Sequence, residues 1–285
     1  MDANFTLSGN GACLYHHSLL THKRIVHGFS LRTDPVSAQE KSYGLNGYQS
    51  ELQVLENRQQ FVKSLSLQCP PSPNAHLRLV TLKQVHSDKA LAAEDLHSGE
   101  IVCSGDALLT GRPGLLLAVQ TADCMPLLIL DPENGAVAAI HAGWRGTVKR
   151  IIEKSVRRLQ ERFGTDPTRC IAVLGPSIRS CCYVVGQEVV SAFHSEFPYA
   201  SRLFHPLGKK SRPTGSQPTM GDGLFLDLPS ACRRQLLDSG MRETCVFTDP
   251  PCTSCDTSRF YSHRAEAGHC GRMMAVIGIL PIRNL

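Results

Sequence analysis

The apolar residues of this chain fall into short, nearly continuous runs separated by turn-forming residues. Leu115–Val119, Met125–Leu130 and Ala136–Ile140 have the length of strands and almost no polar positions, which is typical of strands buried in a core. The segment Pro132-Glu133-Asn134-Gly135 lies between the second and third runs and has the composition of a turn. The pattern therefore predicts a hairpin that runs out along Met125–Asp131 and returns along Ala136–Ile140.

Two further segments have the spacing of amphipathic helices. In Leu52–Leu65 the apolar positions are Leu55, Phe61, Val62 and Leu65. After the hairpin, Thr147 is the expected N-cap of a second helix and Gly164 its C-terminal stop. Its apolar face consists of Val148, Ile151, Ile152, Leu159 and Phe163.

The remaining segments complete a mixed pattern of strands, helices and loops. Strands are expected at Arg78–Val85, Cys170–Leu174, Thr244–Thr248 and Met273–Leu280, helices at Gly186–Phe197 and Leu226–Gly240, a turn at Gly105-Asp106-Ala107, and loops at Ser30–Gly47 and Lys209–Gly223. Hairpins mixed with helices favour a single layered α/β domain over a doubly wound parallel sheet.

Composition narrows the class of protein. The chain has 285 residues, of which 42% are hydrophobic and 19% charged, as in ordinary globular proteins. It has no apolar run long enough to span a bilayer and no secretion signal at its N-terminus, so we expect a cytoplasmic protein without a membrane partner. The net charge of +5, without a dominant basic block, suits a small anion such as phosphate and argues against nucleic acid.

Twelve cysteines are spread along the chain, several of them within apolar segments. Cysteine behaves there as a small hydrophobic residue, so reduced thiols are favoured over a disulfide framework. Cys252-Thr253-Ser254-Cys255 resembles half of a zinc ribbon, but no second pair follows at ribbon spacing.

Three residues at predicted strand ends are candidate metal ligands. The hairpin brings Cys124 and His141 together at its open end, and His86 follows another predicted strand. Two imidazoles and one thiolate suit zinc and leave a fourth position for water or substrate. Two alternatives remain open at this point. Cys124 can instead be a nucleophile with His141 as its base, as in thiol hydrolases, or the three can hold copper, for which Met125 is a poorly placed axial ligand.

Other polar residues near these positions also suggest chemistry. Asp123 is a candidate for proton transfer, with a turn or cap role as the alternative. Arg145 precedes the predicted helix and could bind an anion there, or form a structural ion pair. His263 and Arg264 are expected to approach the same cleft from the C-terminal segment. The cluster His16-His17-Thr21-His22 is expected to be exposed.

Several motifs resemble the signature of the YfiH family, also called the polyphenol oxidase or multicopper-oxidase laccase-domain family. The motifs are Gln84-Val85-His86, Gly105-Asp106-Ala107, Thr121-Ala122-Asp123-Cys124-Met125-Pro126, His141-Ala142-Gly143-Trp144-Arg145-Gly146, Gly175-Pro176-Ser177-Ile178, Cys181-Cys182-Tyr183-Val184-Val185-Gly186 and Phe260-Tyr261-Ser262-His263-Arg264. The sequence departs from the family pattern at Thr33-Asp34-Pro35-Val36, at Ser180-Cys181 and at His263-Arg264. The resemblance covers the chain after about residue 25, which implies a single catalytic domain over 25–285 preceded by a segment 1–24.

The resemblance implies a layered α/β sandwich of mixed sheets flanked by helices, with zinc bound by His86, Cys124 and His141. It also implies a purine nucleoside enzyme that carries out phosphorolysis of adenosine, inosine, guanosine or methylthioadenosine and deamination of adenosine. Within this interpretation Asp123, Cys124 and Arg145 are the catalytic candidates, and Arg32, Asn46 and Arg264 are the substrate-binding candidates. Copper-dependent phenol oxidation and a thiol hydrolase or amidase acting in peptidoglycan editing are the alternative functions.

Overall fold

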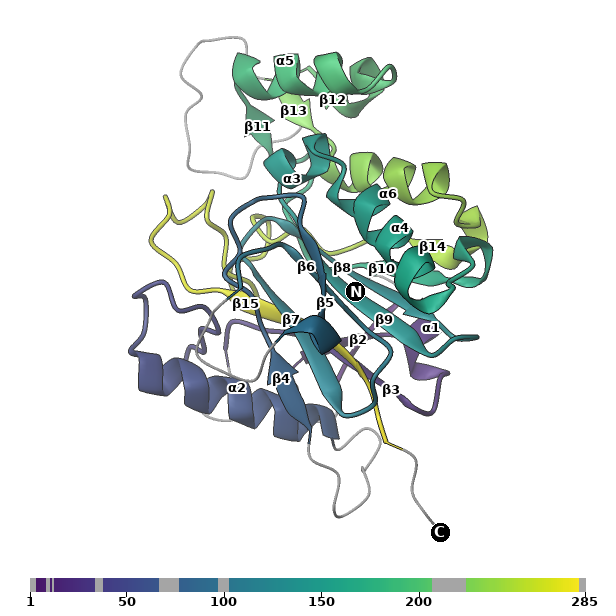
Figure 1. The fold of residues 1–285 in the computed structure, drawn as a ribbon. Helices are drawn as coiled ribbons and strands as arrows, with labels where there is room; N and C mark the ends of the chain where they lie inside the picture. Colours follow the sequence, from purple (N-terminus) through teal and green to yellow (C-terminus); the bar gives the residue numbers. More distant parts are fainter. Residues whose placement is uncertain are drawn as a thin grey trace.

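Two six-stranded mixed sheets form the centre of the molecule (Figure 1). The computed structural model describes residues 4–8, 11, 13–33, 38–66, 77–96, 103–206 and 224–281. The first sheet has the order β1-β2-β3-β15-β7-β4, with strands Phe5–Leu7, Cys13–His16, Ile25–Ser30, Met273–Ile279, Leu115–Thr121 and Arg78–Val80. The second has the order β14-β10-β8-β9-β6-β5, with strands Val246–Phe247, Ile171–Leu174, Met125–Asp131, Ala136–Ala142, Ala107–Thr110 and Ala90–Ala92.

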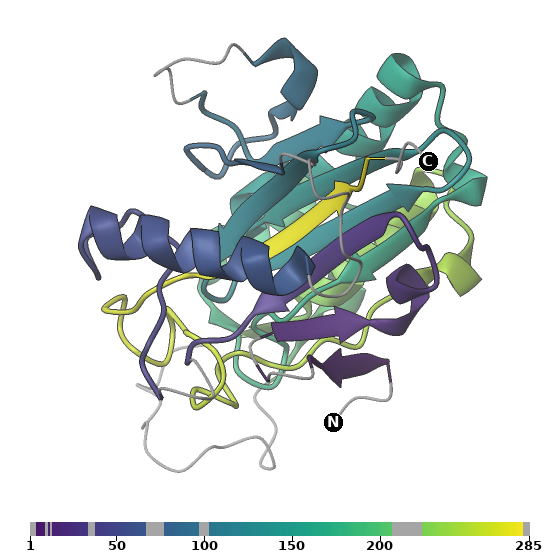
Figure 2. The same ribbon diagram turned by 90° about the horizontal axis from the view of Figure 1, so that it is seen from below.

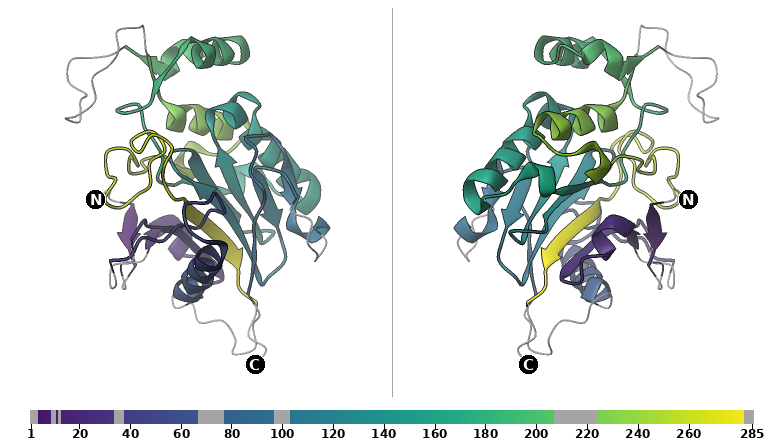
Figure 3. Two further views of the ribbon diagram at one scale, coloured as in Figure 1. Left: turned by 90° about the vertical axis from the view of Figure 1, so that its left-hand side faces the viewer. Right: turned by 90° about the vertical axis from the view of Figure 1, so that its right-hand side faces the viewer.

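Helices cover the outer faces of both sheets, so the fold has four layers (Figures 2 and 3). Helix α2 (Glu51–Ser66) lies on the first sheet, and α4 (Ile151–Phe163) and α6 (Leu228–Asp238) lie on the second. A small sheet of β11 (Val184–Val185), β13 (Leu224–Leu226) and β12 (Phe204–His205) stands with α5 (Gln187–Glu196) at one end of the molecule. The predicted layered α/β architecture is therefore confirmed.

Burial on both faces explains why the central strands read as continuous apolar runs. Successive side chains of a strand point to opposite faces. In β8, Leu127 and Ile129 pack under the helices, while Leu128 and Leu130 pack between the sheets. A strand covered on both faces has no position left for a solvated polar side chain.

The predicted hairpin is present and sets the position of the site. Strands β8 and β9 pair antiparallel from Asp131↔Ala136 at the turn to Met125↔Ala142 at the open end. Pro126 faces His141 in this register, so Cys124 lies just beyond the paired end of β8 and next to β9. The sequence argument for bringing Cys124 and His141 together is correct.

Two helix details differ from the prediction. Thr147 is not an N-cap: it lies inside the short helix α3 (Trp144–Val148), and its hydroxyl donates to the carbonyl of Gly143. A left-handed Arg150 (φ 62°) separates α3 from α4, which ends at left-handed Gly164 (φ 69°) as predicted. In α2 it is Val54 that is buried, whereas Leu55 is 43% exposed, so the apolar stripe is wrong by one position there.

Several segment boundaries and one exposure prediction also change. The strand predicted over Arg78–Val85 spans only Arg78–Val80, and the strand near Thr244–Thr248 is only Val246–Phe247. His16 is buried rather than exposed, since it ends β2 and caps α1 (His17–Leu20) through a hydrogen bond from the backbone N–H of Ser18. The predicted loop Lys209–Gly223 lies outside the described residues. Among the described helices, none is both long and apolar enough to cross a membrane.

Candidate metal centre and its cavity

The side chains of His86, Cys124 and His141 converge at the open end of the β8–β9 hairpin. Their ligand atoms all lie within 4.8 Å of one another, and Cys124 Sγ is 3.8 Å from His86 Nε2. Tetrahedral zinc with bonds of about 2.3 Å to sulfur and 2.0–2.1 Å to nitrogen separates such atoms by about 3.6 Å. The donor set and its spacing therefore fit a zinc ion with one coordination position open.

Asp106 holds two of the three ligand residues in place. Its Oδ1 accepts hydrogen bonds from His141 Nδ1 (2.9 Å) and from the backbone N–H of His86 (3.0 Å). Its Oδ2 accepts from the backbone N–H (2.6 Å) and the hydroxyl (2.7 Å) of Ser87. Since Asp106 occupies Nδ1 of His141, the Nε2 atom is the one directed to a metal, as in carboxylate–histidine–zinc arrangements.

The backbone around the ligands takes conformations that side chains rarely allow. His86 (φ 56°) and Asp123 (φ 82°) are left-handed non-glycine residues, a form of strain that concentrates at functional sites. Gly143 contacts the ligands directly. A Cβ placed there would lie 2.8 Å from His86 Cδ2 and 3.0 Å from Cys124 Sγ, so only glycine fits without displacing them.

The electrostatics of the pair Cys124 and His141 favour an anionic sulfur. Burial raises the pKa of the Cys124 thiol, but His141 and His86 outweigh burial and lower this pKa to about 6. Burial lowers the pKa of His141, but Cys124 and the hydrogen bond to Asp106 raise it overall to about 9. Burial likewise raises the pKa of Asp106, yet the hydrogen bonds from His141 and Ser87 bring it down to about 2. A metal ion would bind the thiolate and displace the proton of the imidazolium.

Met125 does not serve as an axial ligand in this arrangement. Its side chain is fully buried in the core between the second sheet and its helices. The three ligand atoms also account for His86, which a simple Cys124–His141 nucleophile and base pair leaves unexplained.

The three ligands lie in the wall of a cavity of about 950 Å³. A cavity of this size accommodates a small-molecule substrate. Among the residues that the structure describes, its lining is basic: Arg58, Lys83, Arg145, Arg264 and Arg272 line it together with one carboxylate, that of Asp123. An excess of positive charge around a cavity attracts anions.

Most of the predicted site residues reach this cavity. Arg145, Arg264, Asn46 and His263 all line it. The Arg145 guanidinium lies 4.3 Å from the ring centre of Trp144, and that of Arg264 lies 5.3 Å from the ring centre of Tyr183, which also line it.

Arg32, expected in the nucleoside pocket, is not among the lining residues. Its guanidinium pairs with Glu40 (2.6 Å) and Glu266 (2.8 Å) and donates to the carbonyl of Thr257 (3.1 Å). It also lies over the ring of Tyr261. These contacts connect the loop after β3 to the C-terminal segment. The positive charge of Arg32 is balanced by the two carboxylates.

Asp123 is buried and fixed from two sides. Oδ1 accepts the hydroxyl of Thr253 and Oδ2 accepts the backbone N–H of Arg264, both at 2.6 Å. Asp123 therefore links the loop that carries Cys124 to two loops near the C-terminus. Each carboxylate oxygen retains a second lone pair for another partner.

Four residues of this centre are not identified by the sequence argument: Asp106, Gly143, Tyr183 and Thr253. Each of them lies within a motif noted from the sequence, but the sequence predicts no role at the site for it. The sequence pattern places Asp106 in a turn, although a carboxylate is a usual orienting partner for a ligating histidine.

Fold and site together define a class: a layered α/β protein with a candidate metal centre of two histidines and one cysteine in the wall of a basic cavity. Residues 26–280 match the family described as multi-copper polyphenol oxidoreductase laccase. The chain belongs to this family, the one that includes YfiH and YlmD proteins.

Relatives of known name extend along most of the chain. A purine nucleoside phosphorylase, YlmD of Bacillus subtilis, is 30% identical over 264 residues, covering 90% of each protein. An adenosine deaminase, RL5 from an unknown prokaryotic organism, is 34% identical over 201 residues, covering 68% of this chain and 72% of that protein. The crystal structure of the hypothetical protein YfiH of Bacillus licheniformis superposes with a TM-score of 0.80 at 27% identity, covering 97% of this chain and 99% of that one.

Proposed function

We propose that this protein is a zinc-dependent purine nucleoside enzyme that cleaves purine nucleosides with phosphate and deaminates adenosine. The observation that carries the proposal is the convergence of His86, Cys124 and His141 in the wall of a cavity whose other charged groups are mainly basic. The names of the two relatives point to the same substrate class.

His86, Cys124 and His141 would hold the metal, and Asp106 would fix the imidazole of His141 and the backbone of His86. When bound, zinc supplies Lewis-acid polarisation of an oxygen at its open coordination position. Copper is the alternative ion, because the same donors also suit it.

The basic groups of the cavity would bind phosphate. Arg145 and Arg264 line the cavity, and a guanidinium offers paired donors that match phosphate oxygens. Each is held over an aromatic ring, Arg145 over Trp144 and Arg264 over Tyr183. Asn46 adds an amide in the same wall for the nucleoside.

Both reactions need a proton to reach a departing nitrogen. In phosphorolysis a phosphate oxygen bonds to the ribose C1′ as the C1′–N9 bond breaks, and the purine takes up the electron pair and a proton. In deamination water adds at C6, ammonia leaves, and a proton from the water ends on the departing nitrogen. Asp123 is our candidate for moving this proton, because it lines the cavity beside Cys124.

The test is to incubate zinc-loaded protein with adenosine, with and without phosphate, and to separate the products. We expect adenine and ribose 1-phosphate only when phosphate is present, and inosine in either case. Cys124→Ala should lose turnover and the metal ion of this centre, whereas Cys245→Ala, also half-buried but outside the cavity lining, should keep both.

Two results would overturn the proposal. One is zinc-loaded protein that turns over no purine nucleoside. The other is a Cys124→Ala variant that retains the metal content of the wild type and full activity. Oxygen consumption with a phenol by copper-loaded protein would instead support phenol oxidation, and rapid alkylation of Cys124 in metal-loaded protein would support a thiol hydrolase.

A further inference from the structure

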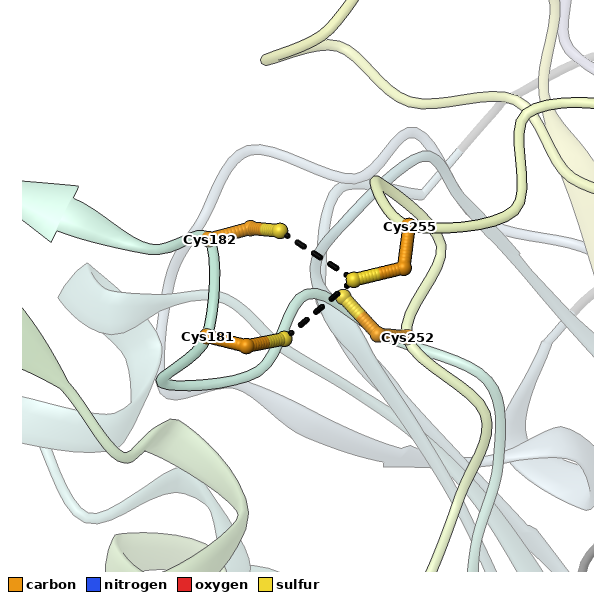
Figure 4. A group of neighbouring side chains, drawn as sticks. All are labelled: Cys181, Cys182, Cys252 and Cys255. Carbon is orange, nitrogen blue, oxygen red and sulfur yellow. Dashed lines mark hydrogen bonds between the residues drawn. The ribbon is translucent and has the colours of Figure 1, made fainter. Parts of the chain in front are cut away.

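A second group of thiols lies outside the cavity just described. Cys181 and Cys182 belong to the turn between β10 and β11, and Cys252 and Cys255 to the loop after β14. The four sulfur atoms lie within 4.8 Å of one another, although the two pairs are separated by some seventy residues of chain. Figure 4 shows all four side chains directed into the same space between the two loops.

The spacing of these sulfurs suits one tetrahedral ion. Cys255 Sγ is 3.4 Å from Cys181 Sγ and 3.3 Å from Cys182 Sγ, and all four thiols are free. Zinc bound to four thiolates at about 2.3 Å separates neighbouring sulfurs by about 3.8 Å. The two distances from Cys255 therefore lie within about half an ångström of this spacing.

Hydrogen bonds also hold the two loops beside each other. Ser177 pairs with the Cys252 loop, donating its N–H to the Pro251 carbonyl (3.3 Å) and accepting from the N–H of Thr253 (3.1 Å). Arg179 donates a side-chain hydrogen bond to the carbonyl of Pro250 (3.2 Å). The ligand loops are therefore arranged in advance, which reduces the entropy lost when an ion binds.

The surroundings also suit the charge of such a site. A divalent ion with four thiolates has a net charge of −2, which needs nearby donors and cations. The cationic side chains of Arg179 and Arg259 line the same surface hollow as Cys252 and Cys255, together with the carboxylate of Asp256.

We propose that Cys181, Cys182, Cys252 and Cys255 bind a structural zinc ion, separate from the ion at His86, Cys124 and His141. Four protein thiolates close the coordination shell of zinc, so this site leaves no position for a substrate. In the sequence, Cys252–Cys255 resembles half of a zinc site without a second cysteine pair at the usual spacing. The structure supplies this second pair from another loop, as the adjacent residues Cys181 and Cys182.

The position of this ion gives it a role in shaping the cavity. Thr253, between two of the ligands, donates to Asp123. Tyr183 follows Cys182 directly and lines the cavity, and the carbonyl of Val184 accepts from Arg264 (2.6 Å). An ion that joins the two loops would therefore fix one wall of the cavity from behind.

The experiment counts zinc in protein purified under reducing conditions without added metal, using inductively coupled plasma mass spectrometry. We expect two zinc ions per chain in the wild type, one in Cys124→Ala, one in the double variant C181S/C255S, and two in the control Cys245→Ser. The count needs no substrate, so it stands apart from the proposed activity.

A second measurement covers the case in which the double variant fails to fold. Native mass spectrometry of folded Cys124→Ala should show one bound zinc, which a thiol-specific mercurial releases. The proposal is overturned if Cys124→Ala contains no zinc, if iron replaces zinc, or if the four cysteines are alkylated as fast as Cys245 in freshly purified wild type.

Discussion

One oxygen of Asp106 fixes two of the three ligand residues of the candidate zinc centre. Oδ1 lies 2.9 Å from Nδ1 of His141 and 3.0 Å from the backbone nitrogen of His86. The contact to His86 matters because that residue is left-handed (φ 56°), so its backbone needs support from neighbouring groups. A single fully buried carboxylate thus couples the loop before β5 to the end of the central hairpin.

Asp106→Asn should weaken zinc binding by about 10- to 100-fold, the usual effect of removing a partner behind a ligating histidine. The asparagine amide has no negative charge. Its NH₂ group would also face the N–H and O–H donors that now bind the carboxylate, and it cannot accept hydrogen bonds from them. The measurement is a competition titration with a chelator. Asp131→Asn is the matched control, since Asp131 is equally buried but supports the turn at the far end of the same hairpin through the N–H groups of Glu133 and Asn134. Equal zinc affinity in the two variants would contradict the role of Asp106.

Gly143→Ala should lower zinc affinity by at least about tenfold, comparable to losing an orienting partner. The new methyl group would lie 2.8 Å from His86 and 3.0 Å from the Cys124 sulfur, so both ligands must move. Gly186→Ala is the control, because Gly186 is also an N-cap residue with negative φ, but a Cβ added there would meet no atom within 4 Å. Retained affinity in Gly143→Ala, measured by the same chelator competition, would show that the ligands accommodate the methyl group.

The sequence is sufficient to predict what depends on local pattern. Continuous apolar runs predict the β8–β9 hairpin, and the hairpin in turn places Cys124 beside His141. Contacts between distant segments are not accessible in this way. Asp106 reaches 35 residues along the chain to His141, and Cys182 reaches 73 residues to Cys255. The pairing of β6 with β9 brings Asp106 to His141, and two loops bring Cys182 to Cys255. The apolar pattern within one segment does not reveal which distant segment lies beside it.

The error at Thr147 has a different origin. A threonine before an apolar stripe is a strong N-cap signal, and the stripe itself is confirmed from Ile151 to Leu159. The chain instead begins a short helix at Trp144, breaks at left-handed Arg150 and begins again. Arg150 is held in that conformation by ion pairs to Glu153 and Glu196, the second of which lies on another helix.

Arg145→Gln should raise the KM for phosphate roughly tenfold while changing the KM for adenosine little. A charge-assisted hydrogen bond contributes about 1.5–3 kcal/mol, and partial exposure of Arg145 reduces this. Arg157→Gln is the control, since Arg157 is exposed on α4 and pairs with Glu161 away from the cavity. Initial rates over a range of phosphate concentrations provide both constants. An unchanged KM for phosphate in Arg145→Gln would remove this residue from the anion site.

Stability should fall in mild acid because of two buried histidines in the first sheet. Burial lowers the pKa of His27 to about 3 and that of His16 to about 4, and the backbone N–H of His16 donates to His27 Nε2 (2.9 Å). In the unfolded chain each titrates near 6.5.

Below that pH the unfolded state binds protons that the folded state does not. Each histidine should therefore lower the free energy of unfolding by ~1 kcal/mol for each unit that the pH falls between about 6.5 and the pKa of that histidine in the folded protein. We expect His27→Gln, which keeps an acceptor for His16, to lose about half of this pH dependence, and His17→Gln at an exposed position to lose none. Urea unfolding of the three proteins at pH 7 and 5.5 measures the difference. An equal loss of unfolding free energy between pH 7 and 5.5 in wild type and His27→Gln would show that the buried imidazole does not control stability in acid.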